Sequence, residues 1–124
     1  MEFYICKTCG NIIAYARSSG VPVMCCGAKM EQLAPNTTDA AQEKHVPVIA
    51  VEGDLVTVTV GEVEHPMTEE HSIQWIALHT RQGNQRKELA PGSKPCAQFK
   101  LCEGDSVVAA FAYCNLHGLW KQDA

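Results

Sequence analysis

Seven cysteines in a chain of 124 residues constrain the fold more than any other feature of the sequence. Four of them lie before residue 27 and three lie after residue 95. An odd number with such uneven spacing fits a disulfide framework poorly, whereas cysteines clustered in a cytosolic chain point to metal. The sequence therefore predicts a metal-binding segment in its first part, with disulfides as the alternative.

Composition and charge narrow the possible functions. The chain is 46% hydrophobic and 19% charged, as in an ordinary globular protein, and no apolar run approaches the roughly 18 residues that a membrane span needs. Its first residues lack the basic and apolar segments of a secretory signal, so we expect a cytoplasmic protein. The net charge of −4 argues against a nucleic-acid partner, and residues 35–124 carry seven basic against twelve acidic side chains. An anionic substrate would therefore need a local positive charge at its binding site.

The first four cysteines have the spacing of a metal site. Cys6 and Cys9 are separated by two residues, so one turn can direct both thiolates to the same ion, and Gly10 frees the backbone that follows. Cys25 and Cys26 complete a tetrahedral sulfur shell suited to zinc or iron. Adjacent side chains of a strand point to opposite faces, so this second pair can share an ion only where the backbone bends. Spacing alone does not choose between iron and zinc.

The rest of the chain has the pattern of an all-β domain. We expect a small metal-binding domain at residues 1–35, followed by one helical turn with Asp39 as its N-cap. β-Branched and alternating segments predict strands at residues 55–60, 72–79, 96–101 and 106–113, with turns at 52–54, 82–84 and 103–105. Short strands with regular turns and no long helix predict an antiparallel β-sandwich over residues 36–124.

Four histidines and one cysteine of this domain form a second candidate site, namely His45, His65, His71, Cys114 and His117. His45 and His65 flank a predicted hairpin, so they are expected at the same end of the sheet, and Cys114 and His117 lie three residues apart at a strand end. Imidazoles with one thiolate suit iron, copper or zinc, and five protein ligands leave one open position on a six-coordinate ion. The site is therefore catalytic in principle, but its spacing does not name a substrate.

The two constellations together resemble desulfoferrodoxin, the two-iron class of superoxide reductase, over nearly the whole chain. The resemblance rests on Cys6-x-x-Cys9 with Cys25-Cys26, and on the segments Glu43-Lys44-His45-Val46-Pro47, His65-Pro66-Met67, His71-Ser72-Ile73-Gln74-Trp75-Ile76 and Cys114-Asn115-Leu116-His117-Gly118. It implies a desulforedoxin-like domain at residues 1–35 with a tetrahedral iron, followed by an immunoglobulin-like antiparallel β-sandwich at 36–124.

The resemblance also implies the chemistry. Two mononuclear non-haem irons would be bound per chain, the second by the four histidines equatorially with Cys114 as the axial thiolate. This site would reduce superoxide to hydrogen peroxide by one electron. Glu43 would close the open position in the resting state, while Lys44 would supply positive charge and order a proton-donating water. A rubredoxin-like protein is the implied electron donor, and members of the family are typically homodimers.

Other functions remain open at this level. The chain could be an electron-transfer protein without catalysis of its own, in which the four-cysteine iron is the working centre. A zinc-stabilised binding module and a superoxide dismutase are further alternatives. Three residues match no ligand of the pattern: we expect Cys96 and Cys102 to be buried free thiols, and His79 to be an exposed histidine at a strand end.

Overall fold

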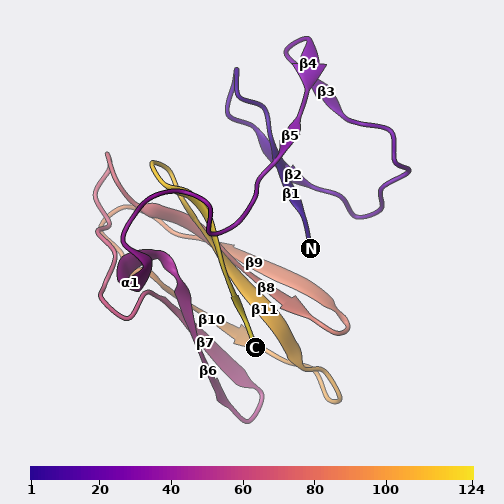
Figure 1. Cartoon of the computed structure of the whole chain (residues 1–124). Coiled ribbons are helices and arrows are strands. Elements are labelled where there is room, and N and C mark those ends of the chain that lie inside the picture. The colour runs from indigo at the N-terminus through magenta and orange to yellow at the C-terminus, as the bar shows by residue number, and fades with distance from the viewer. The chain divides into compact units, whose positions relative to one another are not determined.

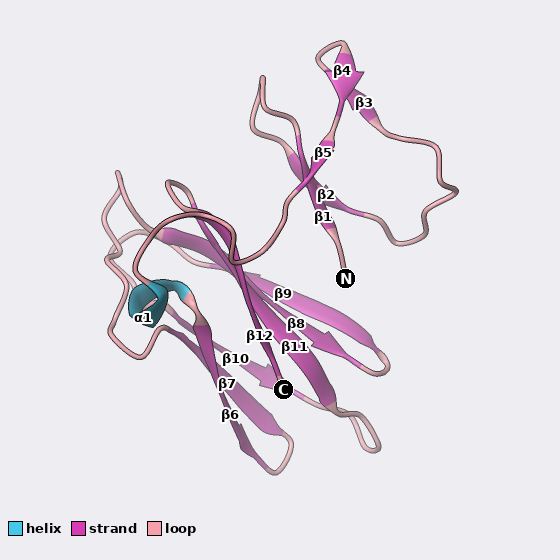
Figure 2. Cartoon of the chain, viewed as in Figure 1, coloured by secondary structure: helices cyan, strands magenta, loops and turns pink.

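The computed structural model describes all residues, 1–124, and the chain divides into two compact units, Met1–Ala34 and Pro35–Ala124. Both the N-terminal and the C-terminal unit consist of antiparallel strands (Figures 1 and 2). The one helix, α1 (Gln42–His45), is four residues long. This helix is too short to cross a membrane. The expectation of an all-β fold is confirmed.

The N-terminal unit contains five short strands: β1 (Phe3–Ile5), β2 (Ile12–Ala14), β3 (Met24–Cys25), β4 (Ala28–Lys29) and β5 (Glu31–Gln32). β1 lies between β2 and β5 in one sheet, and β3 pairs with β4 in a second. The buried hydrophobic side chains of this unit are Phe3, Cys6 and Met30. So small a core supplies little hydrophobic stabilisation, so the unit needs a further constraint such as a bound metal ion.

The C-terminal unit contains seven strands: β6 (Pro47–Glu52), β7 (Leu55–Val60), β8 (Ile73–Thr80), β9 (Gly83–Glu88), β10 (Cys96–Lys100), β11 (Val107–Cys114) and β12 (Gly118–Asp123). They form two antiparallel sheets, with strand orders β10-β7-β6 and β12-β11-β8-β9. The sheets face each other in Figure 1, and buried side chains of β7, β8 and β11 form one core between them. This arrangement is the expected antiparallel sandwich.

The burial pattern explains why four strands were predictable. In β7 the residues alternate between buried and partly buried, which matches the alternation of valine with leucine and threonine. In β8 six of eight residues are buried, so both of its faces are covered. The four predicted strands are present, each shifted by at most one residue at either end. The predicted hairpin is also present, because β6 pairs with β7 and the chain turns at Gly53 with φ of 61°.

In the C-terminal unit two strands, β9 and β12, were not predicted. β9 has the sequence Gly-Asn-Gln-Arg-Lys-Glu and five of its six residues are exposed. Charged side chains on an edge strand prevent it from pairing with a strand of another molecule. The sequence of β9 therefore lacks the alternation of apolar and polar residues by which a strand is recognised. β12 is held by its pairing with β11, in which Cys114 lies opposite Gly118.

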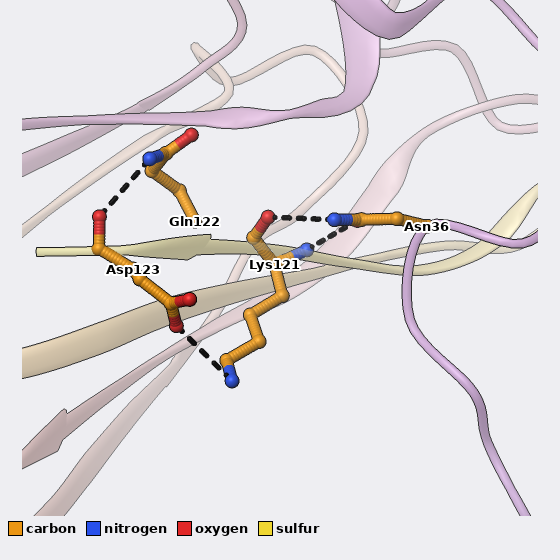
Figure 3. Close-up of polar contacts among 4 residues, drawn as sticks. All are labelled: Asn36, Lys121, Gln122 and Asp123. Atoms are coloured by element: carbon orange, nitrogen blue, oxygen red, sulfur yellow. Dashed lines mark hydrogen bonds and ion pairs between the residues drawn. The ribbon is translucent and has the colours of Figure 1, made fainter.

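The segment before α1 differs from the prediction. The helix begins at Gln42 with Ala41 as its N-cap and no side-chain cap, so Asp39 does not start it. An asparagine holds this segment instead: Lys121 N donates to Asn36 Oδ1 at 2.8 Å, and Asn36 Nδ2 donates to Lys121 O at 3.0 Å (Figure 3). The left-handed backbone of Asn36, with φ of 61°, directs the amide toward β12. Side-chain hydrogen bonds to a distant strand therefore fix this segment, and a local cap does not.

The three residues outside the motifs are only partly as expected. All seven cysteines are free, but Cys102 is exposed and Cys96 is half-buried, so the prediction of two buried thiols is wrong. Cys102 lies just beyond the end of β10, where the chain enters a turn open to solvent. His79 is half-buried inside β8 because that strand is central in its sheet.

Candidate metal centres

The four N-terminal cysteines converge from two turns. Cys6 follows β1 and Cys9 lies in the next turn, which is closed by a hydrogen bond from Gly10 N to Cys6 O at 2.8 Å. Cys25 ends β3, and Cys26 begins the turn to β4 with a φ of 53°. This left-handed residue is the bend that two adjacent cysteines need in order to face one ion. The structure thus has the bend that the adjacency required.

The sulfur positions suit a tetrahedral ion. The four sulfur atoms lie within 4.8 Å of one another, and the Sγ atoms of Cys9 and Cys25 are 3.6 Å apart. Metal–sulfur bonds of about 2.3 Å in a tetrahedron place two sulfurs about 3.8 Å apart. The observed distance is close to that value and far longer than a disulfide bond. The cluster therefore has the size of a four-thiolate metal site.

The pKa values of the thiols in this cluster shift in opposite directions. Hydrogen bonds, first of all from the backbone of Cys9, lower the pKa of Cys6 to about 6. Hydrogen bonds with the other three cysteines raise the pKa of Cys26 to about 12. Four thiols so close together cannot all ionise without a positive charge between them. A bound cation removes this conflict, because it stabilises every thiolate at once.

The second cluster lies at one end of the sandwich. His45 ends α1, just before β6, and Cys114 ends β11. His65 and His71 lie in the loop that joins β7 to β8, and His117 lies in the turn between β11 and β12. Three of them, His45, His65 and Cys114, are at most 3% exposed. The structure therefore brings together all five residues that the sequence suggested for this site.

The four imidazoles stand around a common centre. Neighbouring rings around it are 4.6 to 5.1 Å apart between centroids and cross at 73 to 89°. The rings of His45 and His71 lie opposite each other, 6.4 Å apart. The four distances between neighbouring rings are nearly equal and the distance between His45 and His71 is longer, so the ring centroids lie almost at the corners of a square. Four equatorial ligands of one metal ion have this arrangement.

The hydrogen bonds of the rings leave unprotonated nitrogens at the centre. His45 Nδ1 donates to Ala41 O and His65 Nδ1 donates to Pro66 O, both at 2.7 Å. In the neutral rings Nε2 then carries only a lone pair, yet the two Nε2 atoms are 3.1 Å apart. His45 Nε2 is also 3.1 Å from Nδ1 of His117. Nitrogens bound to one ion at about 2.1 Å and at right angles lie about 3.0 Å apart.

Protonation does not relieve this contact. Burial lowers the pKa of His65 to about 4, and burial also lowers the pKa of His45, so both rings are neutral near pH 7. Two buried lone pairs facing each other repel unless a cation lies between them. His71 Nε2 is likewise buried without a hydrogen-bond partner. The residues present therefore fit a metal ion bound at the centre of the four rings.

Cys114 adds a sulfur to this nitrogen set. Its Sγ lies 3.8 Å from His117 Nδ1, and the residue is fully buried. Burial raises the pKa of the Cys114 thiol, although backbone hydrogen bonds from Leu116 and His117 act in the opposite direction. A thiol in this position ionises only when a positive charge lies beside it. A metal ion supplies that charge.

Glu43 and Lys44 lie on α1 directly before His45, and both side chains are exposed. Burial and the charge of His117 lower the pKa of His71, and the charge of Lys44 adds to this effect. Burial likewise lowers the pKa of His45, against which Glu43 is a weak opposing charge. Both charges therefore act on the imidazoles from the solvent side of the cluster.

Trp120 contacts two of the histidines from within the core, the ring of His45 and the backbone of His117. It is 1% exposed, and its ring lies 4.9 Å from that of His45 at an angle of 30°. Its Nε1 donates to His117 O at 3.1 Å. Its position six residues after Cys114 is the only sequence signal for this role.

Two residues near the cluster, Gly61 and Asn115, were not predicted to act there. A Cβ on Gly61 would lie 2.7 Å from the carbonyl oxygen of Glu43, so this glycine lets the loop after β7 pass close to α1. The side chain of Asn115 bonds to the backbone on both sides of His71, at Glu70 and Ser72. Asn115 lies inside the Cys114–His117 motif, whereas nothing in the sequence marks Gly61.

Comparisons with known proteins agree with this geometry. Residues 37–123 match the model of the desulfoferrodoxin family. A desulfoferrodoxin of Syntrophotalea carbinolica is 47% identical over 123 residues, which are 99% of this chain and 96% of that protein. The crystal structure of the superoxide reductase from Treponema pallidum has a TM-score of 0.83 at 39% identity and covers 98% of both chains. A superoxide reductase (1Fe-SOR) from Giardia intestinalis covers 66% of this chain and 97% of its own, with a TM-score of 0.57 at 38% identity.

The two clusters account for these similarities in chemical terms. The resemblance implied two iron centres, one with four sulfur ligands and one with four imidazoles and one sulfur. The two clusters have the same sets of ligand atoms. The fold that carries them extends over nearly the full length of the similar proteins. The chain belongs to the desulfoferrodoxin family.

Proposed function

We propose that this chain is a superoxide reductase that converts superoxide, one electron and two protons into hydrogen peroxide. The second cluster would hold an iron through its four histidines and Cys114, and this iron would supply the redox chemistry. The four cysteines of the N-terminal unit would hold a second iron. The names of the similar proteins support the activity.

One observation carries the proposal most directly. The Nε2 atoms of His45 and His65 meet at 3.1 Å although both rings give their Nδ1 protons to backbone carbonyls. A structural histidine pair would place a proton between its nitrogens, whereas metal ligands must not. Five protein donors around one ion leave one coordination position for a small ligand.

Bound ferrous iron supplies the electron and the position at which superoxide binds. The chain supplies the environment for that step. The two backbone carbonyls fix the tautomers of His45 and His65, which keeps both Nε2 atoms available as donors. Backbone hydrogen bonds from Leu116 and His117 stabilise the Cys114 thiolate. Trp120 and the sandwich core exclude water from the rings on the inner side.

Lys44 and Glu43 act on the open side. The exposed ammonium of Lys44 provides the local positive charge that a superoxide anion needs near a unit rich in carboxylates. We assign Lys44 the further role of ordering the water that donates a proton to the reduced oxygen. Glu43, its neighbour, would supply a carboxylate to the open side of the site in the resting oxidised state.

We further propose a small redox protein of the rubredoxin type as the electron donor, and a homodimer as the working assembly. Turnover needs the donor because each superoxide consumes one electron that the reaction does not return. The domain at residues 1–35 would bind the iron of the four-cysteine site, and the domain at residues 36–124 would bind the catalytic iron. The cytoplasm is the proposed location, since it provides reduced donors and reduced thiols.

Anaerobic pulse radiolysis of the ferrous protein tests the activity. With excess donor we expect one hydrogen peroxide for each superoxide consumed and no release of dioxygen. Cys114→Ser should lose the activity, while Cys102→Ser, which changes an exposed cysteine away from the site, should keep it. Half a peroxide per superoxide together with dioxygen would indicate a dismutase instead. Zinc at both sites, or absence of any reaction, would leave a binding or electron-transfer protein.

A further inference from the structure

The side chain of Asn115 joins two loops that carry different metal ligands. Asn115 lies between Cys114 and His117, in the turn from β11 to β12. Its Oδ1 accepts the backbone N–H of Ser72 at 3.0 Å, and its Nδ2 donates to the carbonyl oxygen of Glu70 at 2.9 Å. A third hydrogen bond runs from Asn115 N to Ser72 O at 3.3 Å. One residue therefore bonds to the residue before His71 and to the residue after it.

The His71 loop needs such a contact. Residues 61–72 form no strand, and the backbone ladder between β8 and β11 begins only at Ile73, which pairs with Cys114, so it starts two residues after His71. Thr68 closes a turn with His71, in which Thr68 N donates to His71 O at 2.9 Å and His71 N donates to Thr68 Oγ1 at 3.0 Å. This turn shapes the loop internally, and the ladder from Ile73 onward holds it only on the side after His71. The amide of Asn115 holds the backbone on both sides of the ligand, because its partners are Glu70 and Ser72.

The imidazole of His71 has no comparable anchor of its own. His45 and His65 are each held by a backbone carbonyl oxygen at Nδ1, whereas neither ring nitrogen of His71 has such a partner in the protein. The orientation of the His71 ring therefore depends on where its backbone is held. The hydrogen bonds from Asn115 to the backbone beside His71 therefore do for this ring what the carbonyl contacts do for the rings of His45 and His65.

We propose that Asn115 is a positioning residue of the metal centre, which holds His71 in register with Cys114 and His117 through its side-chain amide. The inference rests on the ligand set of the proposed function. It does not depend on the substrate, because it concerns the binding of the metal alone.

The test replaces Asn115 by alanine and measures metal binding at each site separately. In Asn115→Ala we expect the iron affinity of the His/Cys site, measured by competition with a chelator, to fall 10- to 100-fold, the usual effect of removing a partner that orients a ligand. The iron affinity of the four-cysteine site should stay unchanged and serves as an internal control. In the metal-free protein the amide hydrogen of Ser72 should exchange faster, because its acceptor is gone.

Asn36→Ala is the matched control. Asn36 also bridges a distant backbone through its Oδ1 and Nδ2, but its partner is Lys121, which binds no metal (Figure 3). Its positive φ makes alanine additionally unfavourable there, so this variant should lose at least as much folding stability as Asn115→Ala. The control should nevertheless retain the iron affinity of the His/Cys site and the visible spectrum of the oxidised protein.

The outcomes separate positioning from general stabilisation. A selective loss of affinity in Asn115→Ala supports the proposal. An unchanged affinity, or an equal loss in both variants, overturns it. If Asn115→Ala shows the selective loss of affinity but the unsubstituted iron-loaded protein does not reduce superoxide, the result counts against the proposed function and leaves the role of Asn115 intact.

Discussion

Gly61→Ala should disturb the site without changing any ligand. A Cβ at this position would lie 2.7 Å from Glu43 O, 3.0 Å from Val46 O and 3.1 Å from the carbonyl carbon of Lys44. All three contacts are with backbone, so no flexible side chain can move aside. The loop and α1 must separate by several tenths of an ångström, and α1 carries Glu43, Lys44 and His45.

The magnitude follows from the crowding and from the displacement. Inserting a methyl group into a packed site costs about 1–3 kcal/mol of unfolding free energy. Val63 N donates to Glu43 O at 2.8 Å, so the displacement also weakens this hydrogen bond. A misplacement of about 1 Å in a reacting group can cost about a hundredfold in rate, so we expect about a tenfold loss from the smaller shift.

The assay measures the second-order rate of superoxide reduction by pulse radiolysis and the unfolding free energy by urea titration. Gly53→Ala is the control, because Gly53 has a φ of 61° and no atom within 4 Å of an added Cβ. That variant should lose about 1–2 kcal/mol from backbone strain at the hairpin turn and keep the rate. A Gly61→Ala protein with an unaltered rate and a normal iron content would refute the reasoning, because α1 would then tolerate the displacement.

Three further predictions concern single residues of the site. Lys44→Ala should slow superoxide reduction about tenfold with unchanged iron content, and should weaken the dependence of the rate on ionic strength, since the local positive charge is lost; an unchanged bimolecular rate contradicts this role. Burial lowers the pKa of His65 to about 4 from its ordinary 6.5, so as the pH falls His65 is protonated in the unfolded chain before it is protonated in the folded one. The free energy of unfolding of the metal-free protein should therefore fall by at most about 3 kcal/mol between pH 6.5 and 4 through this residue. Urea unfolding should show no such fall in His65→Gln. Trp120→Phe should cost about 1–3 kcal/mol, because it removes the hydrogen bond to His117 O and part of a buried ring. Trp120→Ala should cost about 3–5 kcal/mol and release iron more readily; equal effects would show that the ring does not support His45.

The sequence was sufficient to predict which cysteines and histidines gather into the two candidate metal sites. Cysteines and histidines are rare, and their chemistry is strong enough that spacing alone carries information. The adjacency of Cys25 and Cys26 required a bent backbone, and the structure has it at Cys26, with φ of 53°. The hairpin between β6 and β7 followed from alternating valines around a turn, because burial of one strand face leaves a period of two in the sequence.

The sequence was less informative where local patterns compete with distant contacts. Asp39 has the chemistry of a helix cap, yet α1 starts at Gln42, because this segment is held by Asn36 on β12 and by the contact with Gly61. β9 has no apolar alternation because it is an exposed edge, and Cys102 is exposed because its turn faces solvent. Each of these outcomes depends on which segments become neighbours after folding.

The amino-acid sequence by itself determined which side chains have the chemistry to bind metal in this protein and where four of the strands around its buried core lie. Only the tertiary structure decided how those side chains meet. It turned four rings to face one centre, directed the Nδ1 protons of His45 and His65 to carbonyl oxygens, and placed Asn115 across the His71 loop. The physical reason is that composition and spacing specify ligand chemistry locally, whereas the direction of a lone pair depends on hydrogen bonds and packing between residues far apart in the chain.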